Sequence, residues 1–333
     1  MADEPKPILE DIPPERTTKR VDTGVDVLNP FPPVEVTLLD KEECLTRAGE
    51  GAPKDCPSQR LPGFSFKARP AATPAEREVR GLTDTPRVKP YVVFLPDQRY
   101  TYTDSSFPWS TVGKVRNAGA SGSGVVIGPR HVLTASHCIN WKRDQNGNIG
   151  WASFTPAYYD GRGPWGEFSV RRVISWVENG LQMTDQQTAF DYAVLVLHNT
   201  INDKVGGYAG ARIYDAAWNG QTLWQTLGYP GDLNNAERPT FQRDCVISSK
   251  EDFSFPTGRG PKGSVLGHFN DTFRGMSGGP NWGTWPNEPG PSVVGVNSTS
   301  PTVPQAGSSA GDNEYGGGAA MVELVNWARS NDP

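Results

Sequence analysis

Residues 275–280 read Gly275-Met276-Ser277-Gly278-Gly279-Pro280, a serine set between glycines. Glycine adopts backbone angles closed to other residues and lets a ligand approach the main chain. The N–H groups of Gly275 and Ser277 could then point together at one developing oxyanion beside the serine hydroxyl. A glycine-rich turn explains the stretch equally well, so the remaining residues that a nucleophile needs decide the matter.

A serine nucleophile requires a base and a third group that orients the base. His137 follows an apolar run that starts at Val132, and Asp191 precedes another that ends at Leu197. The order along the chain is therefore histidine, aspartate, serine. Subtilisins place the aspartate first, and α/β-hydrolases place the histidine after the serine, whereas the last histidine here is His268. Both of those folds are thereby excluded.

This order resembles the chymotrypsin/trypsin superfamily. Four further landmarks resemble its bacterial glutamyl endopeptidase branch: Pro96–Arg99, Phe107–Gly113, Ser121–Gly128 and Leu227–Asp232. The resemblance covers about residues 92–330 and implies an all-β fold of two six-stranded antiparallel β-barrels followed by a C-terminal helix. The expected limits are about 108–205 for the first barrel, about 206–320 for the second and about 320–330 for the helix.

The apolar pattern agrees with this architecture. Short runs between Gly, Pro, Asn and Asp turns predict strands at Val112–Val115, Gly124–Ile127, Val132–Thr134, Val170–Ile174, Ala193–Leu197, Thr226–Tyr229, Cys245–Ser248 and Val293–Val296. Near the C-terminus, apolar residues at i, i+3, i+4 and i+7 predict one face of a helix, namely Met321, Leu324, Val325 and Ala328.

Residues 1–85 differ from the protease domain expected at 86–333. They are rich in proline and mix opposite charges over few apolar runs, which argues against a core of their own. Two interpretations stay open: a pro-segment that is removed to activate a zymogen, or a permanent arm wrapped on the catalytic domain. Val34–Leu39 predict one added strand, and Thr73–Val79 predict a short helix capped by Thr73.

Charge and hydropathy exclude several classes of partner. The 333 residues carry a net charge of −5, which gives no reason to expect nucleic acid, and no run approaches the roughly 18 apolar residues of a membrane span. The sequence contains no zinc motif, so no metal or cofactor is expected. We expect a monomer that acts on protein or peptide substrates.

Four cysteines make disulfides and an oxidising compartment plausible. Four cysteines allow three pairings, and our guess is Cys44 with Cys56 and Cys138 with Cys245. Secretion is expected on this ground, although the charged residues at the start of the chain do not form a signal peptide.

The resemblance also implies a mechanism. His137 would accept the proton of Ser277, Asp191 would orient the imidazole, and the N–H groups of Gly275 and Ser277 would bind the oxyanion. Met276 stands where trypsin-type zymogens carry the aspartate that pairs with a new N-terminus, so that switch is missing. Substrate backbone would pair with an edge strand at Ser298, Thr299 and Ser300.

Side-chain specificity is left open by conflicting residues. Asp271 lies six residues before Ser277, where trypsin carries the carboxylate that receives Arg or Lys. Asp271-Thr272 also resembles a pair found in some glutamyl endopeptidases, in which the aspartate does not define the pocket. Asn297 stands where those enzymes have a histidine that helps to receive glutamate. With neutral groups at Thr272 and Asn297, we expect glutamate to be accepted but weakly selected over glutamine.

Two other functions use the same sequence features. A binding protein on an inactive protease fold usually lacks a triad member, and none is missing here. An esterase would share the triad but would not need the edge strand for a peptide. Reaction with an organophosphonate separates active from inactive protein, and a comparison of peptides with simple esters separates the two enzyme classes.

Overall fold

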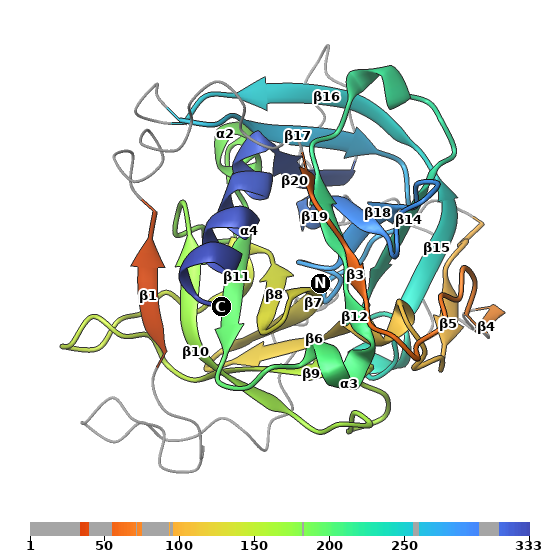
Figure 1. Ribbon diagram of the computed structural model, residues 1–333. Helices are drawn as coiled ribbons and strands as arrows, with labels where there is room; N and C mark the ends of the chain where they lie inside the picture. Colours follow the sequence, from red (N-terminus) through yellow and green to blue (C-terminus); the bar gives the residue numbers. More distant parts are fainter. Residues whose placement is uncertain are drawn as a thin grey trace, which may run out of the picture.

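Figure 1 shows a computed structural model of the chain, built mainly of β-strands with few helices. The structure describes residues 34–39, 55–70, 72–74, 93, 96–181, 183–255, 260–299 and 313–333. All structural statements below concern these residues. Cys44, Ser300 and most of the predicted helix at 73–79 lie outside them.

Six antiparallel strands close the first barrel, in the order β10-β11-β8-β7-β6-β9 with β9 pairing back to β10. They are β6 (Val112–Asn117), β7 (Ala120–Gly128), β8 (His131–Thr134), β9 (Ala152–Pro156), β10 (Phe168–Ser175) and β11 (Ala193–Leu197). Successive side chains of a strand point to opposite faces, so β11 sends Leu195 into the barrel interior and Val194 into the core shared with the second unit. Because both faces are covered, the strand is apolar throughout.

The second unit is one sheet of 11 strands, whose central path is β16-β17-β20-β19-β18-β14-β15. These strands are β14 (Trp224–Gly228), β15 (Thr240–Cys245), β16 (Ile247–Phe253), β17 (Gly263–His268), β18 (Pro280–Gly283), β19 (Ser292–Thr299) and β20 (Asn313–Gly318). The two ends of this path, β15 and β16, are separated in the chain only by Val246. The first and last strands of the path therefore lie side by side where the chain passes from one to the other, and the sheet is strongly curved. The predicted fold class is confirmed, although the second unit carries more strands than the six expected.

Additional strands extend this sheet. β5 (Tyr100–Tyr102) and β4 (Ala72–Pro74) continue it beyond β15, β13 (Gly210–Arg212) joins β19, and β2 (Asp55–Cys56) joins β13. A separate ladder pairs β3 (Gln59–Arg60) with β12 (Gly207–Tyr208). The predicted helix start at Thr73 is wrong, because Ala72–Pro74 pair with β5. Among the described residues β4 is the last strand on this side of the sheet, and proline is tolerated in edge strands.

The C-terminal helix α4 (Ala319–Asn331) lies between the two units (Figure 1). Its predicted face is confirmed, since four apolar residues are completely buried: Met321, Leu324, Val325 and Ala328. Arg329 also ties the helix to the first barrel by donating to the carbonyl oxygen of Ile127 at 2.5 Å. The remaining helices are α2 (Asp185–Thr188), α3 (Asn202–Val205), η2 (Trp109–Thr111), η3 (Ser136–Cys138), η4 (Ala216–Trp218) and η5 (Asn234–Ala236). No helix among the described residues is long and apolar enough to cross a membrane.

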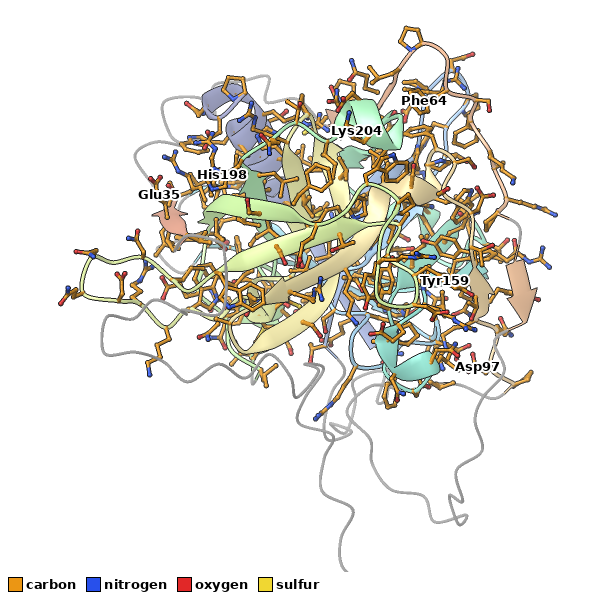
Figure 2. All side chains as sticks on the ribbon, turned by 90° about the horizontal axis from the view of Figure 1, so that it is seen from below. Glu35, Phe64, Asp97, Tyr159, His198 and Lys204 are labelled. Carbon is orange, nitrogen blue, oxygen red and sulfur yellow. The ribbon has the colours of Figure 1, made fainter. Side chains whose placement is uncertain are left out.

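Described segments before residue 85 contact both units. The predicted strand at 34–39 is confirmed as β1 (Glu35–Leu38), which runs parallel to β10. Val34 is completely buried, and Glu35, labelled in Figure 2, accepts from Arg172 Nη2 at 2.6 Å. Cys56 is likewise completely buried beside α4, where its thiol donates to Val322. Removal of residues 1–85 on activation stays a prediction.

Candidate active site

The histidine and aspartate of the predicted triad meet at one end of the first barrel. In the antiparallel ladder of β8 and β11, Thr134 lies opposite Ala193. His137 comes three residues after the first, in η3, and Asp191 two residues before the second. His137 Nδ1 lies 2.6 Å from Asp191 Oδ2, and the backbone N–H of His137 donates to Asp191 Oδ1 at 2.9 Å.

Two further donors complete the hydrogen bonding of Asp191. Ser298 Oγ from β19 donates to Oδ2 at 2.5 Å, so the second unit contacts the pair directly. Asn179 Nδ2 donates to Oδ1 at 3.3 Å, and this residue is 2% exposed. Sequence reasoning missed Asn179, because a single asparagine in a loop carries no motif.

Burial and charge act against each other in this pair. Burial by itself lowers the pKa of His137, but the adjacent Asp191 charge and its hydrogen bond outweigh burial, so the pKa of His137 is raised well above its usual value. For Asp191, burial raises the pKa, and the attraction of His137 with the donated hydrogen bonds lowers it below the usual value. The imidazole is therefore a stronger base than a free histidine.

The serine lies in the loop between β17 and β18, against the first barrel. Its carbonyl oxygen accepts from Ser123 N at 2.7 Å. Gly278 is required here, since its φ is 78° and a Cβ would lie 2.2 Å from Thr134 Oγ1. Ser277 is 6% exposed, and its Oγ makes no hydrogen bond to any described residue. In enzymes without bound substrate, the hydrogen bond between a catalytic hydroxyl and its base is often long.

The backbone of this loop leaves two N–H groups without an acceptor among the described residues, those of Gly275 and Ser277. By contrast, the N–H groups of Met276, Gly278 and Gly279 all donate to carbonyl oxygens. These two open donors are the pair that the sequence predicted for an oxyanion. Gly275 has a φ of 95°, and a Cβ there would lie 2.2 Å from the carbonyl oxygen of Tyr229.

The direction of the Gly275 N–H is fixed by its peptide plane. The carbonyl oxygen of Arg274 accepts from Gly231 N at 2.7 Å, and a trans peptide points its N–H the opposite way. Gly231 is followed by Asp232, whose Oδ2 lies 2.6 Å from Arg99 Nη2. The Arg99 side chain is completely buried and also bonds Asp97, which is labelled in Figure 2. The ion pairs of Arg99 thus hold the segment that contacts the serine loop through Gly231 and Arg274.

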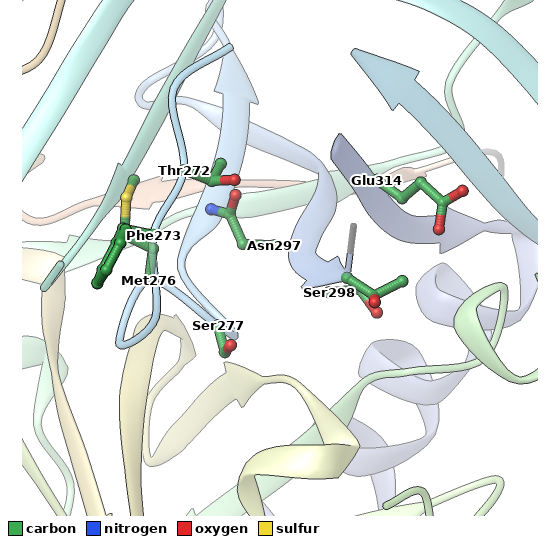
Figure 3. A pocket seen from close by; sticks show the side chains of 8 residues that line it. Thr272, Phe273, Met276, Ser277, Asn297, Ser298 and Glu314 are labelled. Carbon is green, nitrogen blue, oxygen red and sulfur yellow. The ribbon is translucent and has the colours of Figure 1, made fainter. Parts of the chain in front are cut away.

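A small pocket opens beside the serine (Figure 3). Its lining residues are Thr272, Phe273, Met276, Ser277, Asn297, Ser298, Thr299 and Glu314. Four predicted substrate-binding residues are among them, whereas Ser300 lies outside the described residues. Asp271 does not line the pocket: it is 1% exposed, and its Oδ2 accepts from Gln98 N at 2.8 Å. Glu314 was missed because only the ladder of β19 and β20 brings it opposite Thr299.

The predicted disulfides are wrong where the structure describes the cysteines. Cys56, Cys138 and Cys245 are buried free thiols. Cys138 packs beside Gly122, and the Cys245 thiol donates to the carbonyl oxygen of Gln242. Burial raises the pKa of Cys56 to about 12 and raises that of Cys245 as well. Such thiols are unreactive at neutral pH, and the predicted export loses its disulfide argument.

The described residues contain no group of three or more His, Cys, Asp or Glu that could hold a metal ion. The polar groups of the site are instead those of acyl transfer: a base, a hydroxyl and two N–H donors.

Comparisons with known proteins agree with this fold. A family model described as Trypsin matches residues 97–328. A curated glutamyl endopeptidase of Bacillus licheniformis is 25% identical over 209 residues, which are 62% of this chain and 60% of that protein, so the match spans less than two thirds of the relative's length. A solved structure of a Glu endopeptidase in complex with MPD superposes with a TM-score of 0.55 at 20% identity, covering 72% of this chain and 100% of that chain. The resemblance to glutamyl endopeptidases is confirmed at this level.

Proposed function

Because the chain belongs to the trypsin family, we propose that it is a serine endopeptidase that uses His137, Asp191 and Ser277. One observation carries the proposal. Ser298, which lines the same pocket as Ser277, donates to the Asp191 carboxylate of the buried His137–Asp191 pair, and the serine loop has two N–H donors with no acceptor among the described residues. A relative whose name is glutamyl endopeptidase supports peptide-bond hydrolysis as the reaction.

The reaction follows from the chemistry of these groups. Ser277 Oγ attacks the peptide carbonyl while its proton passes to His137 Nε2. The Nδ1–H stays hydrogen-bonded to Asp191, whose charge stabilises the imidazolium that forms. The N–H groups of Gly275 and Ser277 bind the oxyanion. His137 then protonates the leaving amine, and water attacks the acyl-enzyme by the same route in reverse.

The open side of β19 is the proposed binding edge for substrate. Its ladder with β18 ends at Val296, while on its other side Thr299 still pairs with Glu314 of β20. Beyond Val296, no strand among the described residues pairs with this side of β19, and Ser298 lies past the end of the ladder. A peptide adds a strand there, with main-chain hydrogen bonds that do not depend on its sequence. The substrates are proteins or extended peptides.

The test compares a peptide amide with its matched small ester, using the wild-type protein and Ser277→Ala. A peptidase cleaves the extended peptide efficiently and gains from added residues on either side of the bond. An esterase cleaves the ester alone, and an inactive binding protein cleaves neither. Peptide cleavage that persists in Ser277→Ala contradicts the proposal.

A further inference from the structure

Asn297 presents its oxygen, not its nitrogen, as the free atom of its side chain. Nδ2 donates to the carbonyl oxygen of Gly279 at 3.0 Å and contacts Thr226 Oγ1 at 3.1 Å. A carbonyl oxygen only accepts, so the nitrogen must face Gly279, and the amide cannot be turned over. Oδ1 is left buried with no hydrogen-bond partner among the described residues. The residue is 4% exposed and lines the pocket.

A buried acceptor without a donor costs free energy, because it has lost its hydrogen bonds to water and gained none in return. A substrate donor that enters the pocket removes that cost. A substrate acceptor at the same position adds a second unpaired group. The orientation of one amide therefore decides which side chains the pocket accepts.

The charge of the pocket lining is negative, which also favours a side chain that donates hydrogen bonds over a carboxylate. The eight lining residues include the carboxylate Glu314 and no Lys, Arg or His. His268, on neighbouring β17, is completely buried and stacks on Tyr315 at 3.7 Å. Burial lowers its pKa well below the usual value, so it is uncharged.

We propose that this pocket selects a side chain that donates hydrogen bonds, namely Lys, Arg or Gln, and disfavours Glu and Asp. The inference rests on the proposed peptidase function. A carboxylate offers only acceptor oxygens, and it would lie among Asn297 Oδ1 and the Glu314 carboxylate. Specificity is thus opposite to that in the name of the curated relative. The determinants are Asn297 and Glu314, whereas Asp271 lies outside the lining.

One basic residue lies close by in sequence. Arg274 follows the lining residue Phe273 and precedes Gly275, but it is not part of the pocket wall. It is the cation that could turn the preference toward glutamate, so the test includes its removal.

The experiment measures kcat/KM for peptides that differ only in the residue before the scissile bond: Lys, Gln, Glu and Met. Glutamine and glutamate have the same shape, so their ratio reports polarity alone. We expect Gln to exceed Glu by at least about tenfold, which corresponds to roughly 1.4 kcal/mol, and Lys to exceed Gln. A Glu rate equal to or above the Gln rate overturns the inference.

Four variants, one of them a control, show which residues set the preference. Glu314→Gln should lower the Lys-to-Gln ratio toward one, and Asn297→Asp should raise it. Glu323→Gln on α4 is the matched control and should leave every ratio unchanged. Arg274→Gln should leave the Gln-to-Glu ratio unchanged. An unaltered Lys-to-Gln ratio in both Glu314→Gln and Asn297→Asp contradicts the assignment.

Titration with a small sulfonyl fluoride separates this inference from the function on which it rests. The reagent needs the nucleophile but no pocket side chain. Protein that takes up one equivalent at Ser277 and still prefers Glu overturns the specificity alone. Protein that takes up none overturns the proposed function, and the inference with it.

Discussion

The two sides of the candidate active site differ in how completely their polar groups are hydrogen-bonded. The Asp191 carboxylate receives four hydrogen bonds from protein groups, including those of His137 and Ser298. In the serine loop and pocket, by contrast, the N–H groups of Gly275 and Ser277 and the oxygen of Asn297 have no hydrogen-bond partner in the part of the chain that the structure describes. Satisfied groups hold the base in place, and unsatisfied groups remain available to a ligand.

This contrast agrees with the cost of each arrangement. A buried charge such as Asp191 is tolerated only when it is paired and hydrogen-bonded. Unpaired buried donors and acceptors also cost free energy, so their concentration within one loop and one pocket points to a substrate as the missing partner. The variants below each alter either the His137–Asp191 pair or the serine loop and the residues that hold it.

The largest effect is expected from loss of the nucleophile or the base. Ser277→Ala and His137→Ala should each lower kcat for peptide hydrolysis by about a millionfold, because such residues act as a unit. The double variant should be hardly worse than either single variant. Ser249→Ala, an exposed serine on β16, is the control. Near-normal turnover in either catalytic variant would show that the chemistry is misassigned.

Asp191→Asn removes the charge of the fully hydrogen-bonded carboxylate but keeps a side chain of the same shape in its place. We expect kcat to fall by about ten-thousandfold, with a change in pH dependence as well. His137 must be uncharged to accept a proton, so activity is lost as the pH falls through its raised pKa. Without the Asp191 charge, burial lowers that pKa, and the acid limb of kcat/KM should move to lower pH. The control is Asp215→Asn on the exposed cap of η4, and an unmoved limb contradicts the pairing.

Asp232→Asn tests the support behind the open N–H donors. Loss of one of the two carboxylates that pair with Arg99 should let the Gly231–Arg274 contact shift. A misplacement of about 1 Å can cost roughly a hundredfold in rate. Because the oxyanion exists only in the transition state, kcat should fall while KM changes little. Asp203→Asn, from an exposed pair on α3, is the control. An equal loss in KM, or a loss of stability without loss of kcat, contradicts this positioning role.

The smallest effect is expected from Asn179→Ala. It removes one of four hydrogen bonds to Asp191, and one such bond contributes about 1 kcal/mol net, or roughly fivefold in kcat/KM. A loss as large as that of Asp191→Asn would mean that the other three hydrogen bonds are not enough to keep the Asp191 carboxylate in place. The measurement is kcat/KM at a pH above the acid limb.

The sequence predicted the parts of the site that depend on local patterns. The order of His137, Asp191 and Ser277 and the glycines beside the serine identified the fold and the open N–H pair. The spacing of apolar residues also predicted α4, since residues three or four positions apart lie on the same face of a helix. These features are determined within a few residues of the chain.

Features that depend on how distant segments meet were not predicted. Asp271 was expected near the substrate, but the backbone of Gln98 occupies its carboxylate from 173 residues away. Glu314 reaches the pocket only through the register of β19 and β20. The cysteine pairing failed for the same reason, because spacing along the chain does not report which buried thiols lie together.

Labelling of the intact protein with an organophosphonate tests the central claim most directly. Attack on phosphorus requires the hydroxyl, the base and the open N–H donors at once. Peptide mapping by mass spectrometry should find a single adduct on Ser277. The reaction should be lost in His137→Ala and should proceed as in wild type in the Asp215→Asn control. Absence of an adduct, or an adduct on another residue, would contradict the account.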